Sequence, residues 1–139
     1  MIVGIGLDIV EIARWSRVLA KIEEQVFTPR ELAACANRVD RVDALAARFA
    51  AKEACLKALH AGIRHGALRQ VELVSASGGA PEIRLLGVLV EQARESGVRT
   101  AHVSLSHQQG FAAAVVILEG TGKRAPVALE TRSTRGSTW

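Results

Sequence analysis

The sequence predicts an α+β fold, in which antiparallel strands and helices occupy separate stretches of the chain. Two β-rich runs, residues 100–106 and 111–118, flank a short polar turn and are typical of a hairpin. A third such run, residues 2–9, opens the chain. Between them, residues 43–60 are rich in alanine and leucine and contain neither glycine nor proline, which predicts one long helix.

The first predicted strand, residues 2–9, carries one acid, Asp8, at its C-terminal end. Asp8 could cap the following helix, or it could serve a site at the end of the strand. Gly4 and Gly6 do not begin a dinucleotide-binding fingerprint, because the third glycine would have to stand at Ile9.

The second predicted element is an amphipathic helix over residues 11–22. Its apolar residues repeat at helical spacing, and Arg14, Arg17 and Lys21 form a basic stripe on another face. A basic stripe is usually a solvated surface. Because no acid interrupts this one, it could also dock an acidic partner helix, with charge setting the register and the association rate.

A short helix is predicted over residues 29–36, with Thr28 as its N-cap and Glu31 completing a capping box. A polar break follows it. The long helix then begins at Asp40 or Asp43, either of which can cap it.

The long helix carries the most informative charges. Residues three and four apart share a helix face, so Phe49, Glu53 and Lys57 form one row. Arg48 and Lys52 form a second row about 100° away. Alanine offers little bulk, which predicts that Glu53 stands accessible among three cations. Ordinary surface ion pairs explain this pattern, and so does a divalent metal on Glu53 beside phosphates held by the cations.

The second half of the chain alternates short strands with one helix. The long helix is expected to end near His60, with Gly62 as its left-handed stop. The segments predicted after it are a loop over 61–69, strands over 70–75 and 82–85, a turn over 77–81, a helix over 86–96, and a hairpin loop over 107–110 between the last two strands.

Length and composition limit the function classes. The 139 residues suggest one domain over residues 1–120, followed by a disordered Ser/Thr/Arg tail over 121–139. The tail holds +3 of the net charge of +4, so general nucleic-acid binding loses most of its support. No apolar run is long enough to span a membrane, and no signal peptide is evident. Cys35 and Cys55 suggest reduced, partly buried thiols in a cytoplasmic protein.

Few residue groups remain that could carry chemistry. The histidines and cysteines have no zinc-binding spacing, and neither a nucleophile elbow nor a phosphate-binding P-loop occurs. His107 follows Ser106 directly, but strand neighbours point to opposite faces, so the two do not make a catalytic pair by themselves. Asp8 and Glu53 remain. Two hard carboxylates, with phosphate oxygens completing the shell, suit Mg²⁺.

Five motifs in order resemble the holo-(acyl-carrier-protein) synthases, the small single-domain 4′-phosphopantetheinyl transferases. The motifs are Gly-Ile-Gly-Leu-Asp-Ile at 4–9, Phe-Thr-Pro-Arg-Glu-Leu at 27–32, Arg-Phe-Ala-Ala-Lys-Glu-Ala-Cys-Leu-Lys-Ala-Leu at 48–59, Gly-Gly-Ala-Pro at 78–81 and Val-Ser-Leu-Ser-His at 103–107. The resemblance covers about residues 1–119.

The resemblance implies a small antiparallel sheet packed on one long and several shorter helices, in a homotrimer with active sites at subunit interfaces. It implies Mg²⁺-dependent transfer of 4′-phosphopantetheine from coenzyme A to a serine of an apo acyl carrier protein. Adenosine 3′,5′-bisphosphate would be released. Such an enzyme would act in fatty acid and lipid biosynthesis, in the cytoplasm, with neither a nucleic acid nor a membrane as partner.

The resemblance also assigns roles to single residues. Asp8 and Glu53 match the metal ligands, and Lys57 matches a lysine near the pyrophosphate. Either Glu53 or a metal-bound water would take the proton of the serine. The residues that match the coenzyme A site are Arg48, Lys52, Lys57 and His107, with His107 acting across an interface. Arg14, within the basic stripe, matches the carrier-protein docking helix.

Two residues depart from the family's pattern. His60 stands where glycine is usual, and Gln70 replaces a common aspartate. Two other classes compete with the enzyme: a non-catalytic adaptor that binds an acidic partner through its basic helix, and a nucleic-acid binder that uses the tail. The adaptor leaves Asp8 and Glu53 without a role.

Overall fold

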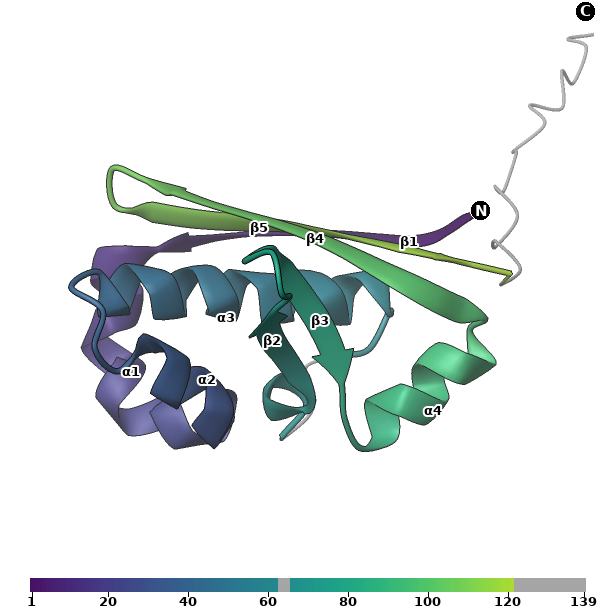
Figure 1. Cartoon of the computed structure of the whole chain (residues 1–139), viewed down its shortest axis with the longest axis horizontal. Coiled ribbons are helices and arrows are strands. Elements are labelled where there is room, and N and C mark those ends of the chain that lie inside the picture. Colours follow the sequence, from purple (N-terminus) through teal and green to yellow (C-terminus); the bar gives the residue numbers. More distant parts are fainter. Residues whose placement is uncertain (63–65, 122–139) are drawn as a thin grey trace, which may run out of the picture.

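A computed structural model describes residues 1–62 and 66–121. The elements alternate as expected between strands and helices (Figure 1). They are β1 (Ile2–Glu11), α1 (Ile12–Val26), α2 (Pro29–Cys35), α3 (Arg41–Ala58), the 3₁₀ turn η1 (Leu68–Gln70), β2 (Val71–Ser75), β3 (Pro81–Leu85), α4 (Val88–Glu95), β4 (Val98–Gln108) and β5 (Phe111–Gly120). The predicted α+β class is confirmed.

A three-stranded antiparallel sheet, in the order β1-β5-β4, forms one layer of the molecule. The helix α3 runs beneath this sheet, and the separate β2–β3 hairpin lies on the far side of α3 from β1 (Figure 1). Helices α1 and α2 gather at one end of α3 and α4 lies at the other. The sheet therefore rests on a single long helix.

Two glycines bring β1 into direct backbone contact with α3. A Cβ atom on Gly6 would lie 1.8 Å from the carbonyl oxygen of Ala54, and one on Gly4 would lie 2.1 Å from that of Ala58. These distances are far shorter than any van der Waals contact, so only glycine fits. The contact sets how close the residues of β1 come to the charged residues of α3.

Side chains of the sheet alternate between an inner face toward α3 and an outer face. Ala101, Val103 and Leu105 of β4 are half-buried, whereas the residues between them are exposed, as the alternation predicted. The outer face is apolar along β1, where Ile5, Leu7 and Ile9 are 60%, 64% and 67% exposed. Their partners on β5 are Ile117, Val115 and Ala113.

The predicted start of α2 is confirmed. The hydroxyl of Thr28 accepts a hydrogen bond from the Glu31 N–H, and the Glu31 side chain accepts one from the Thr28 N–H, which completes the capping box. Cys35 and Cys55 are free thiols, but they are fully rather than partly buried. Burial raises the pKa of Cys55 to about 12.

Three local expectations were wrong. Asp8 lies inside β1, which continues to Glu11, and Glu11 rather than Asp8 occupies the N-cap position of α1. His107 lies in β4 opposite Ala112, because the hairpin turn contains only residues 109 and 110. The left-handed residue after α3 is His60, with φ of 53°, and not Gly62.

Two expectations fall outside the described residues. The predicted disordered tail concerns residues 122–139 almost entirely, and the predicted loop 61–69 includes the undescribed residues 63–65. Within the described ranges, the helices are too short or too polar to cross a bilayer.

Candidate active site

Asp8 and Glu53 come from different elements and line the same cavity, which has a volume of about 580 Å³. Asp8 points from the inner face of β1, two residues beyond Gly6. Glu53 is the residue before Ala54, whose carbonyl touches Gly6. The glycine contact therefore brings the two carboxylates to one place, although 45 positions separate them in the sequence.

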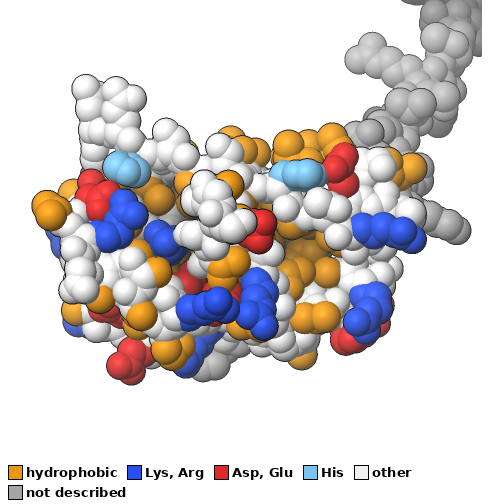
Figure 2. All heavy atoms as spheres, in the orientation of Figure 1, with side chains coloured by type: hydrophobic (Ala, Val, Ile, Leu, Met, Phe, Trp, Pro, Cys, Tyr) orange, Lys and Arg blue, Asp and Glu red, His pale blue; other side chains and the backbone are white. Residues whose placement is uncertain are grey.

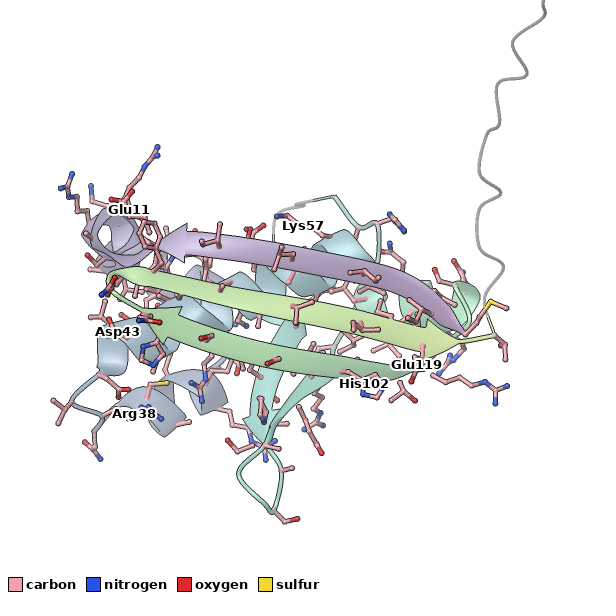
Figure 3. The ribbon with its side chains drawn as sticks, turned by 90° about the horizontal axis from the view of Figure 1, so that it is seen from above. Glu11, Arg38, Asp43, Lys57, His102 and Glu119 are labelled. Atoms are coloured by element: carbon pink, nitrogen blue, oxygen red, sulfur yellow. The ribbon has the colours of Figure 1, made fainter. Side chains whose placement is uncertain are left out.

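Lys57 completes this group from the next turn of α3. Its Nζ donates hydrogen bonds to Asp8 Oδ1 and to the carbonyl oxygen of Leu7, both at 2.9 Å. The Lys57 side chain is 52% exposed and lies beside the free edge of β1 (Figure 3). An anion that approaches Asp8 and Glu53 would meet this ammonium group.

The electrostatics of the pair favour a bound cation. Burial raises the pKa of Glu53, the negative charge of Asp8 raises it further, and Lys57 partly opposes both effects. A divalent cation between the carboxylates would offset this repulsion. Among the described residues, no group of three or more His, Cys, Asp or Glu side chains could enclose a metal. Two carboxylates that leave coordination positions for water and phosphate fit Mg²⁺.

An aromatic wall borders the carboxylates. Trp15, Phe49 and Phe111 line the cavity together with Arg14, and the Trp15 and Phe49 ring centroids are 5.5 Å apart. The sequence analysis assigns these three aromatic residues no role in the site. The sequence contains one signal that could have pointed to them: aromatic residues are scarce, with only two tryptophans and three phenylalanines in the chain.

The basic stripe of α1 begins at the rim of this cavity. Arg14 lines the cavity, and Arg17 and Lys21 follow it as exposed residues on the same helix. The structure thus places Arg14, the first residue of the stripe, in the same cavity as Asp8 and Glu53, which the sequence alone could not do.

Arg48 and His107 lie elsewhere. Arg48 lines a second cavity of about 360 Å³, together with Arg38 and with residues of the β2–β3 hairpin and β4. His107 is an exposed residue of β4 on the inner side, since its partner Ala112 points inward. Basic side chains and a histidine gather on this β4 side of the molecule (Figure 2).

The two groups of charged residues therefore lie at opposite edges of the sheet. Asp8, Glu53 and Lys57 meet at the edge formed by β1, whereas His107 belongs to the other edge strand, β4. The whole of β5 separates the two strands, which places them roughly 10 Å apart at two strand spacings.

Lys52 contradicts its predicted role. Its side chain is 0% exposed, so it does not stand on an accessible surface among phosphate-binding cations. Its Nζ forms an ion pair with Glu31, which is also buried, and donates to the carbonyl oxygens of Leu68 and Val71. Burial lowers the pKa of Lys52, an effect that the charge of Glu31 opposes. Lys52 is a buried residue of the framework.

Comparisons with known proteins identify the family of this chain. The sequence model of the 4′-phosphopantetheinyl transferase superfamily matches residues 4–116. A holo-[acyl-carrier-protein] synthase of Anaeromyxobacter dehalogenans is 48% identical over 130 residues, which cover 88% of this chain and 99% of the relative.

Solved structures of similar proteins have the same fold. The holo-[acyl-carrier-protein] synthase of Neisseria meningitidis superposes with a TM-score of 0.78 at 34% identity, over 86% of this chain and 99% of that one. The Helicobacter pylori synthase, solved in complex with coenzyme A, gives a TM-score of 0.70 at 33% identity, over 83% and 99% of the two chains. This chain belongs to the 4′-phosphopantetheinyl transferase superfamily, among the holo-(acyl-carrier-protein) synthases.

Proposed function

We propose that this enzyme transfers 4′-phosphopantetheine from coenzyme A to a serine of an apo acyl carrier protein and releases adenosine 3′,5′-bisphosphate. The observation that carries the proposal is the meeting of Asp8 and Glu53 at one cavity, with the Lys57 ammonium group hydrogen-bonded to Asp8. Two carboxylates and an ammonium group suit a pyrophosphate and its counter-ion. The Helicobacter pylori synthase, which has the same fold, was solved with coenzyme A bound.

Asp8 and Glu53 are the proposed ligands of Mg²⁺. When bound there, Mg²⁺ would neutralise pyrophosphate charge and polarise the phosphorus toward attack by the serine hydroxyl. The chain itself supplies orientation and charge. Lys57, held by the Leu7 carbonyl and by Asp8, is placed to stabilise negative charge on the leaving phosphate.

The basic face of α1 is the proposed docking surface for the carrier protein. Arg14 stands at the rim of the cavity, and Arg17 and Lys21 extend the positive charge away from it. An acidic helix laid along this face would bring its serine to the carboxylate pair. The charges would set the orientation and rate of docking more than the affinity.

A homotrimer is the proposed assembly, with each active site shared by two subunits. Two features support it. Arg48 and His107 lie at the β4 edge, away from Asp8 and Glu53, so one copy does not gather the whole predicted set. The outer face of the sheet presents Ile5, Leu7 and Ile9, and no described helix covers it (Figure 3). A contiguous apolar face of this kind marks an interface.

Mixing two inactive variants tests the shared site. Glu53→Gln damages the carboxylate half, and the double variant Arg48→Ala/His107→Ala damages the β4 half. When the two are co-refolded in equal amounts, about a quarter of the sites in a closed ring combine two intact halves, so about a quarter of the wild-type rate should return. Each variant refolded alone is the control. No recovery in a mixture that contains hetero-trimers would contradict the shared site.

The proposed reaction is tested by intact-mass spectrometry of an apo acyl carrier protein. Incubation with the enzyme, coenzyme A and Mg²⁺ should add one phosphopantetheine to the carrier, and omission of Mg²⁺ should prevent the addition.

Arg14→Glu should raise KM for the carrier protein at least tenfold, or about 1.4 kcal/mol, and leave KM for coenzyme A nearly unchanged. Carrier binding without any change in mass would instead favour the non-catalytic adaptor.

A further inference from the structure

The buried ion pair between Lys52 and Glu31 has no place in the reaction described above. The side chains of both residues are 0% exposed, and they join α3 to α2. All three hydrogens of the Lys52 ammonium have acceptors, namely Glu31 Oε1 and the carbonyl oxygens of Leu68 and Val71. The Nζ also lies 5.3 Å from the centroid of the Phe27 ring.

Glu31 is equally well satisfied. Its Oε1 also accepts the Thr28 N–H at 3.1 Å, and its Oε2 accepts the Leu73 N–H at 3.3 Å. The Thr28 hydroxyl in turn donates to Glu72 Oε2 at 2.7 Å. The network thus ties one point of α3 to the start of α2, to η1 and to β2, and each of its members is held by more than one bond.

The position of Lys52 on α3 shows which side of the helix the network holds. At about 100° per residue, Lys52 and Ala54 point about 200° apart, on opposite sides of the helix. On the Ala54 side, the backbone of α3 is in contact with Gly6 of β1. On the Lys52 side, the buried network holds the helix. Glu53 lies between them, about 100° from each.

Stability alone does not account for such a pair. The desolvation of two buried charges offsets most of their attraction, and apolar residues of similar volume often stabilise a fold as well. What an ion pair with many directed bonds adds is a fixed rotation and a fixed axial position of the helix. Both quantities determine where the Glu53 carboxylate stands relative to Asp8.

We propose that Lys52 and Glu31 are positioning residues: their buried network locks α3 against β1 so that Glu53 and Asp8 present one cation site of fixed geometry. This inference rests on the proposed function, since it concerns the same carboxylate pair. Lys52 and Glu31 are fully buried and do not line the cavity of Asp8 and Glu53. They act through the backbone of α3.

The test is the double variant Lys52→Met/Glu31→Gln, which removes both charges together and keeps an amide acceptor for the capping box. Mn²⁺ affinity in the presence of coenzyme A, measured by electron paramagnetic resonance, should weaken at least tenfold. Substitutions behind metal ligands commonly cost about 10–100-fold in affinity. The Mg²⁺ concentration for half-maximal transfer should rise in parallel, and KM for the carrier protein should change less than twofold.

Leu89→Ala is the matched control, because Leu89 is 2% exposed on α4 and its truncation destabilises the fold away from the carboxylates. It should lower the melting temperature and leave Mn²⁺ affinity unchanged. If the double variant does not fold, Glu31→Asp, which keeps both charges but shortens the reach toward Lys52, should weaken Mn²⁺ binding in the same direction by a smaller factor.

The outcomes separate the two proposals. Suppose that the wild-type enzyme binds Mn²⁺ and transfers phosphopantetheine. A folded double variant with the same Mn²⁺ affinity and the same transfer activity would then overturn the positioning role and leave the proposed function intact. A wild-type enzyme that does neither would overturn the proposed function and the positioning role with it.

Discussion

Glu53→Gln should abolish transfer while leaving the fold intact, and Asp8→Asn should do the same. Each amide keeps the size of the side chain and removes the negative charge that a divalent cation needs. A bound metal ion contributes several kcal/mol to such a reaction, so a loss of about 4 kcal/mol, or about a thousandfold in kcat/KM, is expected. The rate is measured by carrier-protein mass at saturating Mg²⁺.

The stability of Glu53→Gln supplies an independent check with a defined sign. The pKa of Glu53 is raised by burial and by Asp8, so the charged form destabilises the folded, metal-free protein. The glutamine variant should therefore be at least as stable as the wild type at neutral pH. This advantage should shrink as the pH falls through the raised pKa, because the folded wild type then takes up the proton that relieves its buried charge, and it should vanish below the ordinary carboxyl pKa, where Glu53 is neutral in both the folded and unfolded chains. A variant that unfolds at neutral pH, or that keeps full activity, would contradict the metal assignment.

Gly6→Ala should give the largest loss of stability among single-methyl additions. The new Cβ would lie 1.8 Å from the Ala54 carbonyl oxygen and 2.9 Å from the Ala58 nitrogen. Both are backbone atoms of a helix that the Lys52 network holds from the other side, so neither can move aside cheaply. Overpacking costs about 1–3 kcal/mol and occasionally more, and the upper end, with a fall in melting temperature of about 10 °C, is expected here.

The matched control is Gly78→Ala, since a Cβ at Gly78 would meet nothing within 4 Å and its φ is not positive. Thermal unfolding of both variants makes the comparison. Because Asp8 follows Gly6 by two residues, the folded fraction of the Gly6→Ala protein should also bind Mn²⁺ more weakly than the wild type does. An equal and small effect of both substitutions would show that α3 and β1 are not locked together.

Much of this fold could be predicted because its signals are local. The alternation in β4, the hairpin to β5 and the capping box at Thr28 each depend on residues within one element or one turn. The errors at Asp8 and His107 came from the predicted lengths of two strands. β1 and β4 run further than their apolar cores suggest, which turned Asp8 and His107 from end or loop residues into strand residues.

The candidate site was predicted in part, and for a physical reason. Motif resemblance identified Asp8, Glu53 and Lys57, and the structure brings these three together. The alanine-rich composition of α3 predicts exposed charges, and this prediction is wrong for Lys52. In fact α3 is buried on most sides, with Lys52 directed at Glu31, 21 positions earlier in the sequence. Spacing along one helix cannot reveal a partner on another.

The position of Arg48 and His107 shows the same limit at a larger scale. Both were predicted beside the coenzyme A site, and both lie at the β4 edge of the sheet. Sequence order contains no information on which edge of a sheet faces a neighbouring subunit. The strand order β1-β5-β4 places the two groups of residues at opposite edges of the sheet, and this separation is the reason why a shared site is proposed.

The proposed mechanism requires that Asp8 of β1 and Glu53 of α3 bind one divalent cation. The most direct measurement is an anomalous difference map from crystals of the wild-type enzyme grown with Mn²⁺ and coenzyme A. We predict one peak that is coordinated by an oxygen of each carboxylate and by phosphate oxygens of coenzyme A. If coenzyme A is well occupied, its pyrophosphate lies away from both residues and no peak lies between them, then Asp8 and Glu53 are not the metal ligands.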